Sequence, residues 1–153
     1  MKCFQGKAVL DTNKREAARV GIPNITPKTK VTDFELAIKN AALAAYEGVT
    51  IRYCFFHLKQ SLYRRVQDEG LKTAYNDPDD RTLKEFFHSL LSLGFVPLDY
   101  VEAAYDALYD EILEEGLPVA VYFEENYSVG RRAHGRRRAV PPRFLAKYWN
   151  CYP

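Results

Sequence analysis

Cysteine is scarce in this sequence, and long hydrophobic runs are missing. The three cysteines, Cys3, Cys54 and Cys151, are odd in number and far apart, which argues against the disulfide framework of a small secreted protein. The sequence contains no stretch of about 18 apolar residues, the length that a membrane-spanning helix needs. The leading residues also lack the apolar core of a signal peptide. We therefore expect a reduced, intracellular environment and no membrane partner.

The composition is that of a folded domain with an uneven charge distribution. A hydrophobic content of 47% and an aromatic content of 14% are too high for a disordered chain, and 153 residues fit one domain. The net charge is only +2, but residues 99–130 contain Asp and Glu without Lys or Arg, whereas residues 131–147 contain Lys and Arg without any acid. This split predicts either an internal contact between the two segments or a basic arm for an anionic partner.

Hydrophobic spacing predicts an α/β fold that is predominantly helical. Residues 30–32 and 49–56 have the β-branched and aromatic character of strands, and residues 34–47 between them have helical spacing. A second helical pattern follows at residues 57–69. The order strand, helix, strand, helix is typical of parallel strands joined by a right-handed crossover.

The rest of the chain reads as helical, apart from its beginning. We expect helices from Asp79 or Asp80 to about residue 93, from a capping box at Asp99-x-x-Glu102 to residue 116, and from Pro118 to about residue 127. Residues 1–28 are interrupted by glycine and proline and are rich in Lys and Arg, so we expect them to be weakly structured.

Asp33 is the first candidate site residue, because it follows the first predicted strand. A carboxylate at a strand end is held firmly and stays open to substrate, as phosphodiester transfer with two metal ions requires. The alternative is that Thr32-x-x-Glu35 is a capping box, which would make Asp33 an ordinary acid in the first turn of a helix.

Cys54 and His57 form a C-x-x-H pair at a predicted junction of strand and helix. Sulfur and imidazole nitrogen suit zinc, but a structural zinc site needs four ligands. The remaining candidates have no paired spacing: Cys3, Cys151, His88 and His134. We therefore favour a packed Cys54 and a His57 that caps the next helix.

The run R-R-A-H-G-R-R-R at residues 131–138 is the strongest charge cluster of the chain. Neutralisation of phosphates by such a run is a common, sequence-independent route to nucleic-acid binding. A nuclear-import signal and a solvated loop facing the acidic residues 99–115 are the alternatives. The candidate nucleic-acid-binding residues are Arg131, Arg132, Arg136, Arg137 and Arg138.

Six short motifs in one order resemble the core of a Mutator-like element (MULE) transposase. They are T-D-F-E (32–35), C-F-F-H (54–57), F-V-P (95–97), Y-F-E-x-x-Y (122–127), P-P-R-F (141–144) and W-N-x-Y (149–152). The resemblance covers roughly residues 21–153. It implies a partial RNase H-like core at residues 29–70, a helical insertion at 79–128, and a basic arm with the W-N motif at 129–153, with 1–28 as a poorly matched leading segment.

The resemblance also implies a chemistry, which is DNA strand cleavage and transfer with Mg²⁺ or Mn²⁺. Asp33 corresponds to the middle one of three metal-binding carboxylates, and Cys54 with His57 forms a family signature. The first Asp and the final Glu of the family lie outside the matched motifs, so we expect an incomplete metal site, no tightly bound cofactor and no transposase activity of this chain alone. We further expect non-specific DNA binding, association through an exposed sheet edge, and a location in the nucleus rather than the cytoplasm. The rival interpretation is a non-enzymatic module, derived from a transposon, that binds nucleic acid or protein.

Overall fold

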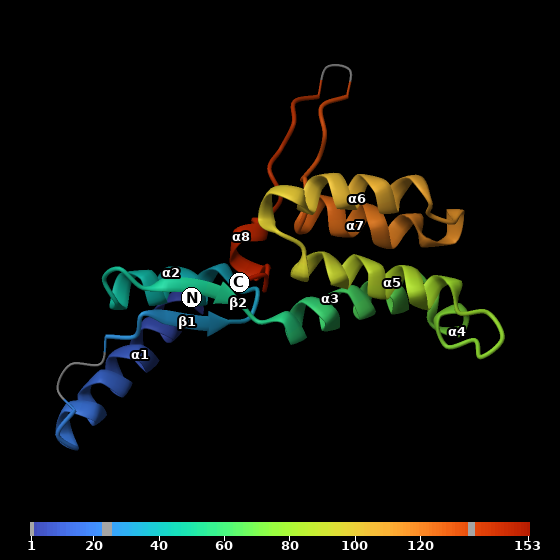
Figure 1. The fold of residues 1–153 in the computed structure, drawn as a ribbon. Coiled ribbons are helices and arrows are strands. Elements are labelled where there is room, and N and C mark those ends of the chain that lie inside the picture. Colours follow the sequence, from blue (N-terminus) through green and yellow to red (C-terminus); the bar gives the residue numbers. More distant parts are fainter. Residues whose placement is uncertain (1, 23–25, 135–136) are drawn as a thin grey trace. The chain divides into compact units, whose positions relative to one another are not determined.

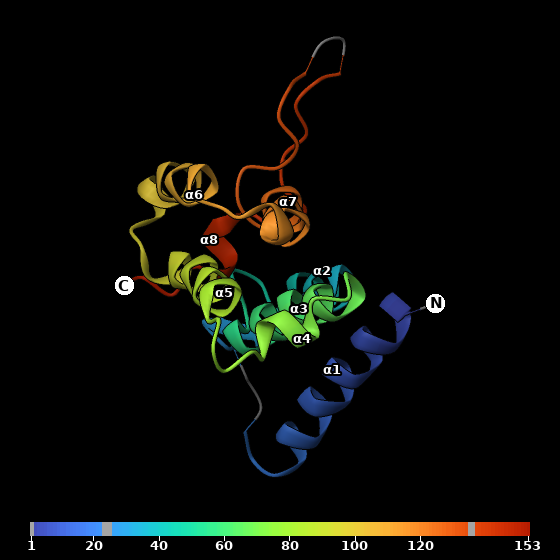
Figure 2. The same cartoon turned by 90° about the vertical axis from the view of Figure 1, so that its right-hand side faces the viewer.

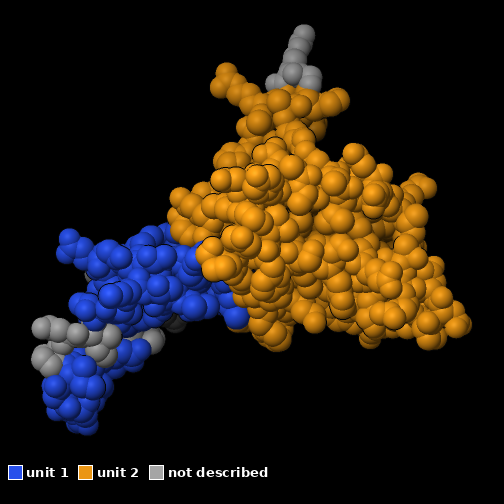
Figure 3. Space-filling model, in the orientation of Figure 1, with its two compact units in different colours: residues 1–54 blue, residues 55–153 orange. Residues whose placement is uncertain are grey.

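The chain folds into two compact units, residues 1–54 and residues 55–153 (Figure 3). Figure 1 shows the fold in a computed structural model, which describes residues 2–22, 26–134 and 137–153. The protein is an α/β protein in which helix predominates and the strands form a two-stranded parallel sheet. The predicted RNase H-like segment, residues 29–70, spans the boundary between the two units.

The first unit contains the sheet. Strands β1 (Thr29–Thr32) and β2 (Thr50–Tyr53) pair in parallel, with Thr29 opposite Thr50 and Thr32 opposite Tyr53, and helix α2 (Leu36–Ala45) connects them. This confirms the predicted order of strand, helix and strand. Cys54 follows β2 instead of lying within it, although its backbone N–H still donates to the Thr32 carbonyl at 2.8 Å.

Helix α1 (Lys2–Arg19) was not expected from the sequence. It packs against α2, and Leu10 and Ala17 are among its buried side chains. The prediction of a weakly structured segment was wrong for these residues. The prolines and Gly21 come after Arg19, and most residues before them favour helix, so the breakers end the helix and do not prevent it.

The second unit is helical. Its longer helices are α3 (Phe55–Asp68), α5 (Thr82–Ser92), α6 (Val101–Asp110) and α7 (Leu117–Asn126), and its short ones are α4 (Lys72–Tyr75) and α8 (Ala146–Trp149). Helix α3 packs against α5 and α7, and α5 packs against α6 (Figures 1 and 2). The side chains predicted to line the inner face of α3, Leu58, Leu62 and Val66, are fully buried. No helix in the described part of the chain is both long and apolar enough to cross a bilayer.

Three 3₁₀ turns change the helix boundaries that were predicted: η1 (Leu93–Phe95), η2 (Leu98–Tyr100) and η3 (Glu114–Gly116). Asp99 lies inside η2 and Tyr100 is the N-cap of α6, so the predicted capping box is wrong. Helix α6 also ends at Asp110, before the predicted Gly116. At α5 the N-cap is Arg81 without a side-chain cap, so the predicted cap at Asp79 or Asp80 is wrong. The Asp80 carboxylate still accepts a hydrogen bond of 2.9 Å from the Thr82 N–H, from the residue before the N-cap.

The W-N motif fastens the last described turn of the chain to the helical unit. The Trp149 indole N–H donates to the carbonyls of Tyr127 at 3.0 Å and Phe144 at 3.1 Å. The Asn150 side-chain amide donates to the Val96 carbonyl at 2.8 Å, and the Cys151 N–H donates to a neighbouring carbonyl in η1. Because these groups satisfy buried backbone carbonyls, the motif has a structural role here.

Candidate functional site

Asp33 directly follows β1 and is half-buried. Its Oδ1 accepts a hydrogen bond of 3.3 Å from the backbone N–H of Glu35, and the N-cap of α2 is Glu35 itself, without a side-chain cap. The predicted position at a strand end is confirmed, and the alternative of a Thr32-x-x-Glu35 capping box is wrong. Asp33 therefore closes a turn before the helix instead of lying in its first turn.

The C-x-x-H pair is divided between the two units, with Cys54 at the end of the first and His57 in the first turn of α3. Cys54 is half-buried, and the Nδ1 atom of His57 is buried without a hydrogen-bond partner. Within the described residues, no group of three or more His, Cys, Asp or Glu could hold a metal ion. Because α3 begins at Phe55, His57 lies inside the helix with an unpaired Nδ1, and its predicted capping role is wrong. The packing of Cys54 stays a prediction.

We name residues 130–141 the arginine arm. Its described residues, 130–134 and 137–141, extend away from α6 and α7 (Figures 1 and 2). Its two sides pair in antiparallel fashion: the Val140 N–H donates to the Arg131 carbonyl at 2.8 Å, and His134 and Arg137 exchange backbone hydrogen bonds of 3.2 and 3.1 Å. Arg131, Arg137 and Arg138 are exposed. Of the other two predicted residues, Arg132 is described below and Arg136 lies outside the described residues.

The base of the arm is fixed on the C-terminal end of α7. The Gly130 N–H donates to the Glu124 carbonyl, and the Phe144 N–H donates to the Asn126 carbonyl, both at 2.8 Å. Gly130 has a φ of +85°, and a Cβ at this position would lie 2.2 Å from the Val140 carbonyl oxygen. Only glycine combines this left-handed conformation with so close an approach of the returning strand.

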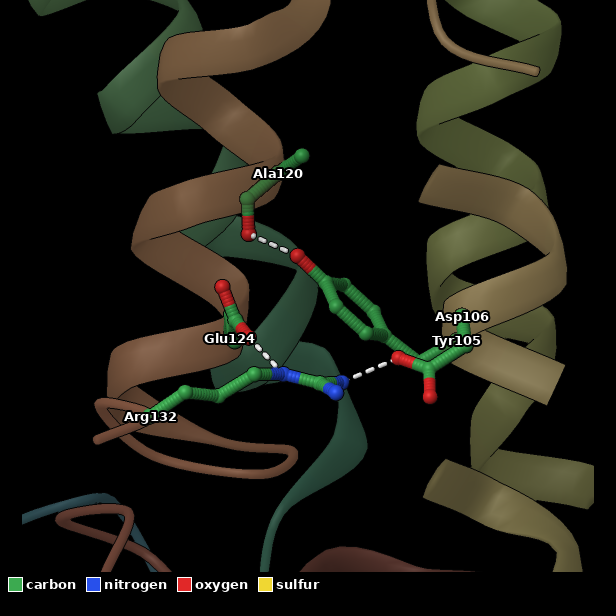
Figure 4. Close-up of polar contacts among 5 residues, drawn as sticks. All are labelled: Tyr105, Asp106, Ala120, Glu124 and Arg132. Carbon is green, nitrogen blue, oxygen red and sulfur yellow. Dashed lines mark hydrogen bonds and ion pairs between the residues drawn. The ribbon is translucent and has the colours of Figure 1, made fainter. Parts of the chain in front are cut away.

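Arg132 connects the arm to both helices (Figure 4). Its Nε lies 2.7 Å from Oε1 of Glu124 on α7, and one of its terminal nitrogens donates to the Asp106 carboxylate on α6. The Glu124 side chain is only 16% exposed, against 45% for Asp106, so water screens the Glu124 pair less. The hydrogen bond to Glu124 is the main cause that raises the pKa of Arg132, which keeps the guanidinium charged.

An open pocket of about 430 Å³ lies beside this contact. Tyr105 forms part of its wall and donates from its hydroxyl to the Ala120 carbonyl at 2.9 Å. Burial, followed by the negative charge of Glu124, raises the pKa of Tyr105 far above its ordinary value. The pocket is lined by Tyr105, Asp106, Tyr109, Asp110, Glu124 and Arg132. Because this lining has three carboxylates and only one guanidinium, it disfavours phosphate.

The sequence did not identify Asp106 and Glu124 as the partners of Arg132. The charge split between residues 99–130 and 131–147 did signal an internal contact between an acidic and a basic segment. No match is found for the chain among protein-family models, curated proteins or solved structures.

Proposed function

We propose that this chain is a MULE-transposase-derived domain that binds DNA non-specifically through the arginine arm and does not cleave DNA by itself. One observation carries the binding proposal: the arm holds Arg131, Arg137 and Arg138 exposed on a paired segment that extends from the helices. Residues 126–153 contain no Asp or Glu, so the arm and its surroundings in the sequence are uniformly basic.

Counterion release supplies the affinity. Each arginine that neutralises a DNA phosphate displaces condensed cations, which favours binding without regard to base sequence. Arg132 is exposed too but is paired with Glu124 and Asp106, so Arg136 is the fourth charge counted, after Arg131, Arg137 and Arg138. Four phosphate contacts correspond to a slope of about −3.6 in log K against log salt on duplex DNA. Such an interface positions a protein on the backbone and reads no bases.

The transposase ancestry is supported by the position of Asp33 relative to the parallel strands. In the order β1, α2, β2, the carboxylate directly follows the first strand, where the resemblance requires the middle metal ligand. One Asp33 oxygen accepts a hydrogen bond from the Glu35 N–H, and this chain offers no companion carboxylates matched by the resemblance. Because Mg²⁺ keeps its waters unless several oxygens are pre-arranged, Asp33 alone would not hold the two ions that strand cleavage needs.

Equilibrium binding to a fluorescent duplex tests the binding proposal. Replacing Arg131, Arg137 and Arg138 with alanine should weaken binding strongly. The matched control replaces three exposed cations elsewhere on the helical unit, Lys59, Arg64 and Lys72, and should bind like the wild type. Equal losses in both variants would show that total charge and not the arm determines affinity. No binding by the wild type would favour the rival, a module that binds protein.

Two further parts of the proposal concern location and assembly. A nuclear location follows from the DNA partner and the arginine run. Each strand of the two-stranded sheet pairs with only one neighbour among the described residues, which leaves backbone groups for association between copies. Light scattering at two protein concentrations tests assembly, and a constant monomer mass would refute it.

A further inference from the structure

We infer that Arg132 is a positioning residue, which braces the arginine arm against α6 and α7 and does not itself bind phosphate. This inference rests on the proposed function. It divides the arginines of the arm into two classes that the sequence does not distinguish. Arg132 is also exposed, at 47% of its side chain, but it is paired with Glu124 and Asp106 and so belongs to the brace. The exposed Arg131, Arg137 and Arg138 face the partner.

The brace depends on two points of attachment. The Nε of Arg132 is bound to Glu124, and a terminal nitrogen is bound to Asp106, so one planar guanidinium joins carboxylates from two helices (Figure 4). A planar fork held at two points has its orientation fixed, unlike the point charge of a lysine. The backbone hydrogen bonds that fix the base of the arm begin at Gly130. The Arg132 side chain, two residues further along, adds a second restraint on the arm.

The electrostatic surroundings of Arg132 oppose a role in phosphate binding. Asp106, Asp110 and Glu124 all line the pocket beside its guanidinium, so a phosphate brought there would meet three negative charges. Moving Arg132 onto DNA would also leave Glu124, which is 16% exposed, without its cation. Removing the partner of a largely buried charge costs more than the pair itself is worth.

Bracing raises DNA affinity because it keeps the arm in the pose that can bind. When only a fraction of the molecules has the competent pose, the apparent dissociation constant rises by the inverse of that fraction. If an unbraced arm occupies that pose about one tenth of the time, binding weakens about tenfold. The number of phosphates contacted in the bound state does not change, so the salt slope stays at about −3.6.

The test compares Arg132→Gln with Arg138→Gln, because each variant removes one positive charge from the arm. For Arg132→Gln we expect about tenfold weaker binding with an unchanged salt slope. For Arg138→Gln we expect a slope that is shallower by about 0.9. An equal reduction of the slope in both variants would identify Arg132 as a phosphate ligand, and tighter binding by Arg132→Gln would identify an inhibitory contact. Either result overturns the inference.

A second pair of variants leaves the arm untouched. Asp106→Asn loosens the brace, whereas Asp110→Asn removes the same charge from the same helix without a contact to Arg132. General electrostatics predicts slightly tighter DNA binding for both variants, so weaker binding by Asp106→Asn alone supports the brace. Tighter binding by both would contradict it. The fluorescence of Trp149, which is buried and is the single tryptophan of the chain, confirms that each variant remains folded.

Hydrogen exchange of the free protein separates failure of the brace from failure of the proposed function. The backbone N–H groups of Arg137 and Val140 are hydrogen-bonded across the arm. They should exchange faster in Arg132→Gln than in Arg138→Gln, whether or not the protein binds DNA. Equal exchange in the two variants would overturn the brace and leave the DNA-binding proposal standing. Faster exchange without any DNA affinity would leave the brace standing and refute the proposed function.

Discussion

The side chains of Glu124 and Arg132 meet at 2.7 Å and join α7 to the base of the arginine arm. Glu124 lies in the Y-F-E-x-x-Y motif and Arg132 in the arginine run, so two features that were separate in the sequence form one contact. Its backbone counterpart is the hydrogen bond from the Gly130 N–H to the Glu124 carbonyl. The same residue of α7 therefore holds the arm through its backbone and its side chain.

Gly130→Ala should destabilise the helical unit by roughly 1–3 kcal/mol. The φ of +85° disfavours alanine, and its Cβ would lie 2.2 Å from the Val140 carbonyl oxygen, so the returning strand would have to move. Gly70→Ala is the matched control, because Gly70 has a φ of +74° with nothing within 4 Å of the added Cβ. Urea unfolding of both variants measures the difference. Equal losses of stability would mean that backbone conformation alone matters and that the base of the arm is not closely packed.

Zinc removal should leave the thermal unfolding transition unchanged. Cys54 and His57 supply two of the four ligands that a structural zinc site needs. Differential scanning fluorimetry with and without a strong zinc chelator provides the measurement. A lower melting temperature in the chelator, abolished by Cys54→Ser, would show that the pair binds a structural ion and that the packing interpretation is wrong.

Stability should fall as the pH rises above about 10. The folded protein holds the pKa of Tyr105 above its ordinary value of 10.0, chiefly through burial, so the unfolded chain loses the phenolic proton first. Where the unfolded state binds fewer protons, the free energy of unfolding declines with pH, by up to about 1.4 kcal/mol per unit for one group. Tyr105→Phe should show a shallower decline between pH 9 and 11 in urea unfolding. Identical slopes for the two proteins would contradict a buried, neutral Tyr105.

Several elements could be predicted because their signals are local. The four-residue spacing of Leu58, Leu62 and Val66 predicted the buried face of α3, and the β-branched and aromatic residues of β2 predicted its strand. Helix α1 was missed because Gly21 and the prolines, the signals that predict weak structure, lie beyond its end. The sequence shows where helix-breaking glycine and proline lie. Whether the residues before them form a helix also depends on the packing of α1 against α2.

The candidate site was predictable in its charges and not in its contacts. The split between acidic and basic segments indicated that Arg132 could form an ion pair with an acidic residue. Which carboxylates it contacts, Asp106 and Glu124, depends on how α6 and α7 pack. The conformation of Gly130 was equally hidden, since the close approach of Val140 depends on how the arm returns to α7. Long-range pairing of this kind depends on the tertiary structure, whereas helix periodicity does not.

The chain alone should neither nick nor join DNA in Mg²⁺ or Mn²⁺. In-line displacement at phosphate concentrates negative charge on the entering and leaving oxygens, and two metals held by several carboxylates normally offset it. Incubation with supercoiled plasmid, beside Asp33→Ala, provides the measurement. Nicking by the wild type that disappears in Asp33→Ala would show that other groups complete the metal site, and the non-catalytic part of the proposal would fail.

The salt dependence of DNA binding tests the central claim most directly. For the wild type we predict a slope of about −3.6 in log K against log salt, from four arginines of the arm. With Arg131, Arg137 and Arg138 replaced by alanine, one of these four remains, and the slope should flatten to about −0.9. A slope that stays the same in the triple variant would place the phosphate contacts elsewhere on the protein and contradict the role of the arginine arm.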